Sequence, residues 1–207
     1  MLLPAIKSSL RATPIYALAR PAILMQWRMR GRPVPPPHAA KEEMIRDAAR
    51  ASEIRSFVET GTYLGDMVHR LENDFDEIVS IEVAPSLHAR ASARFRRKSH
   101  VRILLGDSAR VLTDLLARVS VKTLFWLDGH YSGGVTGQGE LLTPVIKEVE
   151  LVLGHKVKGH VVLIDDAHCF TGQGDYPTIG ALKQIVTGLA PNATFDVVDN
   201  VIRIFPR

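Results

Sequence analysis

The sequence predicts an α/β fold whose mostly parallel sheet ends in an antiparallel hairpin. From residue 40 onward, short apolar runs alternate with longer amphipathic segments, which is typical of parallel strands that helices bury on both faces. The last two apolar runs, residues 194–198 and 201–205, are separated only by Asp199 and Asn200, a pair typical of tight hairpin turns. The pattern therefore predicts five strand–helix units and a two-stranded hairpin, which makes seven strands.

The spacing of the apolar residues predicts where each helix and strand of the domain lies. The first helix of the domain carries Met44, Ile45 and Ala48 on one face, and Gly154 is the expected C-cap of a later helix. The predicted strands before the hairpin are residues 56–58, 78–81, 101–105, 123–127 and 160–164, and the predicted helices are residues 41–52, 64–71, 86–97, 109–119, 142–153 and 178–189.

Residues 1–37 are expected to form a basic arm and a proline-rich linker, and residues 38–207 the main domain. Residues 1–32 hold six basic residues and no acid, and the prolines of residues 33–37 favour a stiff extended chain. Arginines and prolines interrupt the apolar stretches of the arm, so we expect neither a membrane-spanning helix nor a signal peptide. We expect the arm to pack on its own domain or to mediate self-association, with peripheral contact to an anionic membrane as the alternative.

The composition excludes several classes of function. With 46% hydrophobic and 23% charged residues, the chain resembles an ordinary globular protein. Outside the arm it lacks the interleaved basic and aromatic residues of a nucleic-acid surface, so we expect no nucleic-acid partner. Cys169 is the only cysteine, which excludes an internal disulfide and a cysteine-based zinc site, and a cytoplasmic location is the simplest setting.

Acidic residues stand where each of the five predicted parallel strands ends. The carboxyl ends of such strands meet at one edge of the sheet, where ligands bind in open α/β folds. A single acid after a strand is commonly a helix N-cap, and Asp107 or Ser108 is expected to serve in that way as well. Acids after five successive strands favour a ligand site. These acids are Glu59, Glu82, Asp107, Asp128 and the pair Asp165 and Asp166.

The turn after the first strand favours a sulfonium cofactor over a dinucleotide. Gly61 permits close backbone approach to a ligand, and Gly65 lets the next helix begin against the sheet. A nicotinamide dinucleotide needs a turn of the form G-x-G-x-x-G, but here Glu59 precedes the turn and Tyr63 lies within it. A carboxylate would repel a pyrophosphate but attract the sulfonium or ammonium group of S-adenosylmethionine.

Residues 56–65, 81–82, 105–108 and 127–129 resemble the successive cofactor motifs of the class I S-adenosylmethionine methyltransferases. The resemblance covers about residues 40–207 and implies a Rossmann-like seven-stranded sheet with helices on both faces. It implies that the first loop meets the methionine part of the cofactor, that Glu82 binds the ribose, and that Asp107 and Ser108 lie near the adenine. The implied cofactor-binding residues are Glu59, Gly61, Thr62, Tyr63, Gly65, Glu82, Asp107, Ser108 and Asp128.

Asp128, together with Asp165 and Asp166, is similar to the acidic trio of the macrocin O-methyltransferase family. In that family the trio holds a magnesium ion that positions and acidifies the substrate hydroxyls. The resemblance thus implies O-methylation of a small hydroxylated acceptor with metal assistance. This chain differs from the family in having His130 and His168 beside the acids, so Mn²⁺, Fe²⁺ and Zn²⁺ also stay open as the metal beside Mg²⁺.

Two histidines are candidates for the general base. Methyl transfer to oxygen requires removal of a proton from the acceptor, which a neutral imidazole can accept near pH 7. His130 is the first candidate and His168 the second, so the predicted catalytic residues are His130, Asp128 and His168. Asp166 has an alternative role as a cap of the following helix.

Two other functions stay open on the sequence alone. A metal-dependent hydrolase could use the same acids and histidines, although it would leave Glu59, Gly61, Gly65 and Glu82 without a role. A non-catalytic module that binds a partner through the basic arm is the other alternative. Glycine-rich residues 131–142 and 171–177 follow strand ends and are expected to overhang the site.

Overall fold

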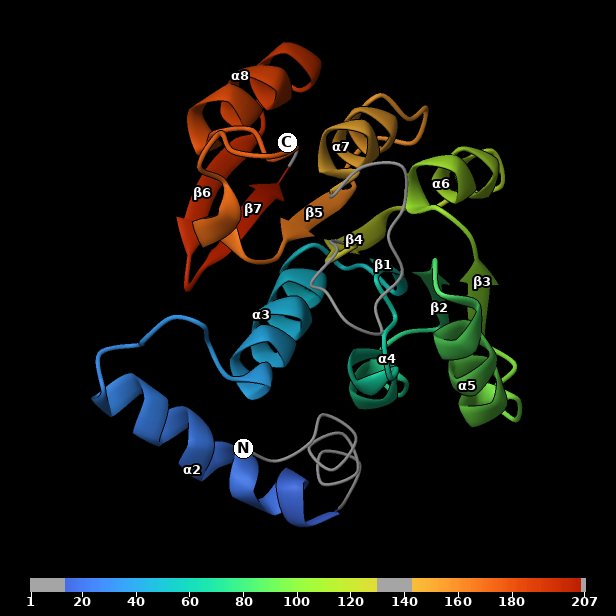
Figure 1. Ribbon diagram of the computed structural model, residues 1–207, viewed down its shortest axis with the longest axis vertical. Coiled ribbons are helices and arrows are strands. Elements are labelled where there is room, and N and C mark those ends of the chain that lie inside the picture. Colours follow the sequence, from blue (N-terminus) through green and yellow to red (C-terminus); the bar gives the residue numbers. More distant parts are fainter. Residues whose placement is uncertain (1–13, 130–142, 206–207) are drawn as a thin grey trace.

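The computed structural model describes residues 14–129 and 143–205. Its seven-stranded sheet has the order β3-β2-β1-β4-β5-β7-β6, in which β1 to β5 run parallel and β7 is antiparallel to both β5 and β6 (Figure 1). The predicted Rossmann-like sheet and its C-terminal hairpin are therefore confirmed.

The strands alternate with helices along the chain from β1 to β5. The strands are β1 (Ser56–Thr60), β2 (Glu77–Glu82), β3 (Val101–Leu105), β4 (Thr123–Leu127), β5 (Val161–Ile164), β6 (Thr194–Val198) and β7 (Val201–Phe205). The helices are α2 (Pro14–Met29), α3 (His38–Ala51), α4 (Asp66–Leu71), α5 (Pro85–Phe95), α6 (Ser108–Leu116), α7 (Val145–Leu153), the short 3₁₀ helix η1 (Ala167–Cys169) and α8 (Ile179–Leu189).

The register of the parallel strands aligns their carboxyl ends. Thr60 pairs with Ile81 of β2 and Leu127 of β4, and Leu127 pairs in turn with Ile164 of β5. The residue after each of these four positions therefore lies at one level along the edge. Those residues are Gly61, Glu82, Asp128 and Asp165.

Alternate residues of the central strands belong to two hydrophobic cores, one on each face of the sheet. Phe57 and Trp126 face the layer of α3 and α4, whereas Val58 and Phe125 face the layer of α6, α7 and α8. All four side chains are buried, because both faces of the sheet are covered by helices. The strand backbones are consequently rigid supports for whatever follows them.

Several element boundaries differ from the sequence-based predictions. The helix predicted from residue 64 begins at Asp66, because Tyr63 and Gly65 adopt left-handed backbone angles that extend the turn. The helix predicted from residue 142 begins at Val145, after Pro144. The helix predicted from residue 41 begins at His38, so that Lys41 lies in its first turn.

The described part of the arm, α2, packs on the main domain. Leu24 and Trp27 are buried against Ala39 and Ala40 at the start of α3. The Trp27 indole Nε1 donates a hydrogen bond of 2.9 Å to the carbonyl of Pro33 in the linker. None of the helices in the described ranges is both long enough and apolar enough to cross a membrane.

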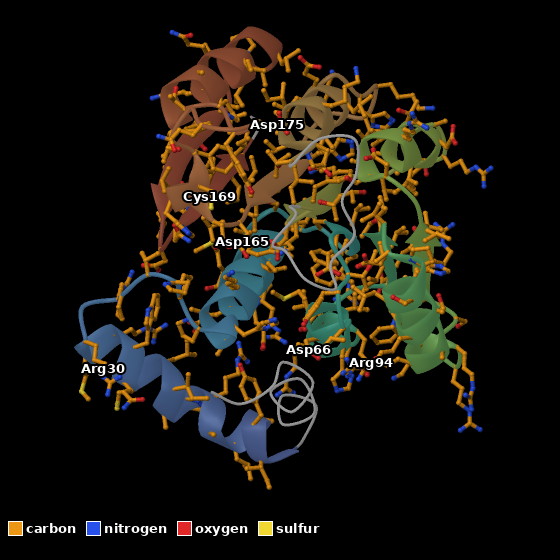
Figure 2. The ribbon with its side chains drawn as sticks, viewed as in Figure 1. Arg30, Asp66, Arg94, Asp165, Cys169 and Asp175 are labelled. Carbon is orange, nitrogen blue, oxygen red and sulfur yellow. The ribbon has the colours of Figure 1, made fainter. Side chains whose placement is uncertain are left out.

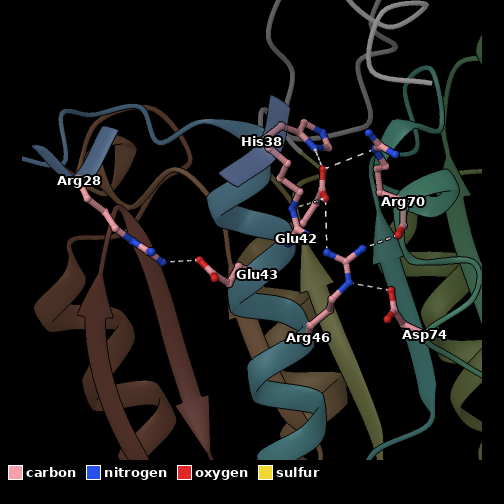
Figure 3. A network of polar contacts seen from close by, with 8 residues as sticks. Arg28, His38, Glu42, Glu43, Arg46, Arg70 and Asp74 are labelled. Atoms are coloured by element: carbon pink, nitrogen blue, oxygen red, sulfur yellow. Dashed lines mark hydrogen bonds and ion pairs between the residues drawn. The ribbon is translucent and has the colours of Figure 1, made fainter. Parts of the chain in front are cut away.

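A polar network fixes α3 against α4 (Figure 3). The carboxylate of Glu42 is almost fully buried between His38, Arg46 and Arg70. The Arg46 guanidinium also donates to the Arg70 carbonyl at 2.6 Å and to the Asp74 carboxylate at 2.8 Å. These contacts hold the first turn of α3 in place beside the sheet.

Candidate functional site

The loop after β1 crosses directly over the end of β4. Gly61 has a φ of 87°, and a Cβ placed on it would lie 2.4 Å from the Asp128 carbonyl oxygen. No side chain fits in that space, so the glycine is required by the chain itself as well as by any ligand. Gly65, at φ 72°, similarly abuts the ring of Phe95 on α5.

The same loop is secured from the side by α5. The Arg94 guanidinium donates to the Leu64 carbonyl at 2.7 Å and to the Asp66 carboxylate at 3.0 Å (Figure 2). The first turn of α4 and the preceding loop are thus held in one conformation.

Glu59 lies beneath this loop and is only 2% exposed. The Ser80 hydroxyl donates to Glu59 Oε2 at 2.5 Å, and the Thr62 hydroxyl lies 2.6 Å from Ser80 Oγ. Burial raises the pKa of Glu59 well above its ordinary value, and the nearby Asp128 carboxylate adds to the shift while the Ser80 hydrogen bond opposes it. The Glu59 carboxyl therefore braces the loop through Ser80 and Thr62.

Glu82, at the end of β2, accepts two backbone hydrogen bonds. Its Oε2 accepts from the Tyr63 amide at 2.7 Å, and its Oε1 accepts from the Ala84 amide at 2.9 Å. Each carboxylate oxygen can accept about two hydrogen bonds, so capacity for a further donor such as a ribose hydroxyl is left on both.

Asp107 caps α6, as the sequence allows. Its Oδ1 accepts from the amides of Ala109 at 3.0 Å and Arg110 at 3.3 Å. Ser108 is buried beside the inward-facing Glu148 of α7. The capping does not exclude the predicted adenine contact, because a carboxylate retains further acceptor capacity.

The three aspartates predicted as metal ligands do come together. Carboxylate oxygens of Asp128, Asp165 and Asp166 lie within 4.8 Å of one another. Figure 2 labels Asp165 at the edge of the sheet beside α3. We call these three residues the acid cluster.

A lysine that the sequence analysis did not single out contacts the acid cluster. Lys41 Nζ forms an ion pair with Asp165 Oδ2 and lies 3.9 Å from Asp166 Oδ1. Burial alone would lower the pKa of Lys41, but the carboxylates of Asp165, Asp128 and Asp166 raise it above its ordinary value. Burial raises the pKa of Asp165 to about 7, and the charge of Asp128 adds to this while Lys41 opposes it. Lys41 is therefore charged, and the surplus of carboxylates favours a shared proton or a further cation.

Asp166 does not cap the following helix with its side chain, so the alternative role expected for it is wrong. Its backbone adopts a left-handed conformation at the start of η1, without a side-chain capping hydrogen bond. The Asp166 carboxylate instead accepts from the Asn200 amide Nδ2 at 3.2 Å.

The β6–β7 turn also holds His168. Asn200 Oδ1 accepts from the His168 backbone amide at 2.9 Å and lies 3.1 Å from the His168 ring Nδ1. An amide oxygen only accepts, so Nδ1 carries the proton in this contact and the lone pair of the neutral ring is on Nε2. His168 Nδ1 lies 3.9 Å from Asp166, and its side chain is about half exposed. The predicted first candidate, His130, lies outside the described residues, as does the predicted loop of residues 131–142.

One further residue near the site, Glu148, was missed by the sequence analysis. Glu148 is fully buried, and its Oε1 and the Thr60 hydroxyl lie against Gly129 without a well-aligned hydrogen bond in the described part of the chain. Burial raises the pKa of Glu148 to about 7, although the hydroxyls of Ser108 and Thr60 oppose the shift. An acid among the apolar residues of the α7 face was a signal for such a position.

Tyr176 belongs to residues 171–177, which the sequence analysis expected to overhang the site. It is half-buried and packs edge-to-face on Phe170 with ring centroids 5.3 Å apart. Burial raises the pKa of its hydroxyl, and the charges of Asp166 and Asp128 contribute to the shift, which sets Tyr176 near the acid cluster. Its segment, residues 171–177, is closed by a bridge between Thr171 and Thr178.

The chain matches no protein-family model, and no curated protein matches its sequence closely. Its structure is similar to that of an O-methyltransferase from Bacillus cereus in complex with SAH, with 12% identity and a TM-score of 0.60 over 91% of this chain and 90% of that one. A SAH-bound methyltransferase from Podospora anserina is 17% identical, with a TM-score of 0.58 over 90% of this chain and 88% of that one. This chain has a methyltransferase fold.

A third structure with the methyltransferase fold is the O-methyltransferase TomG from Streptomyces achromogenes, which is involved in tomaymycin synthesis and was solved with SAM. It is 16% identical, with a TM-score of 0.57 over 91% of this chain and 90% of that one. The similarity therefore extends over nearly the whole chain in all three cases, whereas the sequences have diverged widely.

Proposed function

We propose that this chain is an S-adenosylmethionine-dependent methyltransferase that methylates an oxygen of a small hydroxylated acceptor. The observation that carries the proposal is the alignment of Gly61, Glu82, Asp128 and Asp165 at one level of the carboxyl edge in a methyltransferase fold. The three similar structures were solved with SAH or SAM, which supports the same cofactor.

The cofactor would lie over the ends of β1 to β4. Glu82 retains acceptor capacity for two ribose hydroxyls, and Asp107 and Ser108 stand at the adjacent strand end for the adenine. The first loop, with Gly61, Thr62, Tyr63 and Gly65, would face the methionine part. Glu59 acts there indirectly in our proposal, since its carboxyl lies under the loop and braces it.

The acceptor would lie beside the acid cluster, where a base is available. His168 carries the lone pair on Nε2 when Nδ1 donates to Asn200, and Nε2 lies 3.6 Å from the Cys169 thiol sulfur. In our proposal, Nε2 takes the proton of an acceptor hydroxyl in place of this thiol contact. Asn200 is thus a positioning residue for His168. His130, which follows Asp128 by two positions, is kept as the other candidate base.

We also propose that the acid cluster takes a divalent metal, Mg²⁺ or Mn²⁺, as the resemblance to the macrocin O-methyltransferases implies. Three carboxylates within 4.8 Å offer the oxygen donors that these ions prefer. A metal bound there would supply Lewis acidity that lowers the pKa of an acceptor hydroxyl. The three carboxylates fit the ion, but the ion pair of Lys41 with Asp165 counts against an open site.

The first experiment is calorimetric titration of the full chain with S-adenosylmethionine, with and without Mg²⁺. We expect saturable binding, and then methyl transfer from labelled cofactor to small hydroxylated acceptors. Absence of cofactor binding would overturn the proposal and favour the hydrolase, which would use the acid cluster with His130 and His168. Cofactor binding without transfer to any acceptor would favour the non-catalytic module.

For the arm, we propose peripheral contact with an anionic membrane. Ile15, Leu18, Met25 and Met29 form an exposed stripe on α2, on the face opposite the packed Leu24. The arm holds six basic residues and no acid, and three of these, Arg20, Arg28 and Arg32, form ion pairs with acids of the main domain. The remaining basic residues would repel a second copy of the arm and attract anionic lipids. This charge balance favours the membrane over self-association.

Vesicle flotation tests the membrane contact. We expect the chain to float with phosphatidylcholine vesicles that contain phosphatidylglycerol, and to lose this binding on Leu18→Glu but not on Val121→Glu, a change at an exposed loop residue. A Leu18→Glu-sensitive dimer in light scattering, without vesicle binding, would instead assign the stripe to self-association.

A further inference from the structure

The acid cluster already contains a cation of the chain. The side chains of Lys41 and Asp165 are 16% and 1% exposed, so their ion pair is sheltered from water. We propose that Lys41 is a resident counter-ion of the cluster, which holds the three carboxylates together without a metal and competes with any divalent cation for Asp165.

The position of Lys41 follows from how α3 is built. Lys41 lies in the first turn of α3, and the adjacent Glu42 is fixed by His38, Arg46 and Arg70. Because the helix is anchored by this network, the ammonium cannot leave the cluster through a movement of α3 alone. Its side chain must rotate away, and Asp165 then loses its partner.

Lys41 and a divalent metal would compete for one oxygen of Asp165, namely Oδ2. Asp165 Oδ1 accepts from the Asp166 backbone amide at 2.8 Å, whereas Oδ2 contacts Lys41. A metal that used Asp165 Oδ2 would therefore face a positive charge within ion-pair distance. Repulsion between an ammonium and a divalent ion in a sheltered site is strong, so Lys41 lowers the affinity of the cluster for metals.

The charge balance supports a counter-ion that partly neutralises the cluster. Without a cation, three clustered carboxylates would repel one another and at least one would take up a proton. Lys41 removes one charge permanently and lies near both Asp165 and Asp166. The inference concerns this balance alone, and it holds whether or not the chain transfers methyl groups.

Titration of the full chain with Mn²⁺ tests the proposal without any assay of activity. Calorimetry and the paramagnetic resonance signal of free Mn²⁺ would compare the unaltered chain with Lys41→Met and with Lys183→Met, which removes an exposed lysine on α8. We expect Lys41→Met to bind Mn²⁺ at least about tenfold more tightly, which corresponds to about 1.4 kcal/mol. Lys183→Met should bind as the unaltered chain does. Equal or weaker affinity of Lys41→Met would overturn the proposal.

A second comparison covers the case in which Lys41→Met does not fold. Asp165→Asn removes the buried charge, so both Asp165→Asn and the double variant Lys41→Met/Asp165→Asn should fold. With Asp128 and Asp166 still present, the double variant should bind Mn²⁺ more tightly than Asp165→Asn. Equal affinities of these two variants would overturn the proposal as well.

Discussion

The Lys41 ammonium contacts the Asp165 carboxylate across 124 positions of sequence. The contact joins the first turn of α3 to the residue directly after β5, and both side chains are largely buried. Each charge depends on the other, because a buried charge without a partner is costly.

Removal of the Lys41 ammonium should therefore destabilise the fold, by an amount that depends on pH. At pH 8, we expect Lys41→Met to lower the free energy of unfolding by on the order of 3 kcal/mol, since an unpaired Asp165 carboxylate is left buried. At pH 5 the loss should be smaller, because Asp165, whose pKa is raised to about 7, is then protonated. Urea unfolding at both pH values measures this, with Lys183→Met as the control. Equal losses at the two pH values would contradict the prediction.

Glu82 should control the affinity for S-adenosylmethionine. We expect Glu82→Ala to weaken binding by roughly 1.5–3 kcal/mol, the scale of hydrogen bonds to a charged group. Part of this loss would come from the released amides of Tyr63 and Ala84. Calorimetry measures the affinity, and Glu77→Ala, at the exposed start of the same strand, is the matched control. Unchanged affinity in Glu82→Ala would refute the ribose assignment.

Gly61 should be needed for the fold as well as for the cofactor. A Cβ at this position would lie 2.4 Å from the Asp128 carbonyl oxygen, and the φ of 87° strains any other residue. We expect Gly61→Ala to lower both the melting temperature and the cofactor affinity. Gly188→Ala, in α8, meets nothing within 4 Å, and alanine favours a helix more than glycine does. This control should therefore leave the cofactor affinity unchanged and should not lower the melting temperature. A Gly61→Ala variant as stable as the unaltered chain would show that the loop can move away from β4.

Glu148 should make the stability fall as the pH rises. Its pKa is raised from 4.5 to about 7 in the fold, so the folded chain holds this proton more tightly than the unfolded chain does. The resulting contribution, at most about 3 kcal/mol, is present below pH 4.5 and is lost as the pH rises through 7. Glu148→Gln should flatten the dependence between these values in urea titrations. An unaltered slope in this variant would assign the pH dependence to other groups.

A chelator should separate the acceptor site from the cofactor site. If the acid cluster uses a metal, excess chelator should stop methyl transfer and leave the affinity for S-adenosylmethionine nearly unchanged. Asp165→Asn should act in the same way, and added Mg²⁺ or Mn²⁺ should restore transfer to the chelated protein. Full transfer in excess chelator would remove the metal from the proposed function and leave methyl transfer in place.

The sequence predicted the sheet well because its strands are buried on both faces. Phe125 and Trp126, for example, belong to an uninterrupted apolar run, which has few alternatives to a central strand. The predicted element boundaries were wrong where a single residue determines the local backbone conformation. His160, for example, precedes β5 instead of beginning it, and its ring Nδ1 accepts from the Thr123 amide at 3.1 Å.

The acids of the site were predictable because each lies at or just after the carboxyl end of a strand. Lys41 was not, because its role depends on how α3 packs against the sheet, and no local pattern in the sequence encodes that distance. The same holds for Asn200, which reads as a turn residue but also orients His168. The residues that act across long sequence separations are the ones that pattern analysis misses.

The shared register of the strand ends limits which insertions and deletions a protein with this fold can tolerate. One residue inserted into β4 would move Asp128 by about 3.3 Å and turn its side chain to the opposite face of the sheet. Asp128 would then no longer stand level with Gly61 and Asp165. Strand lengths must therefore stay constant during evolution, and a change of acceptor must arise in the segments that connect the strands.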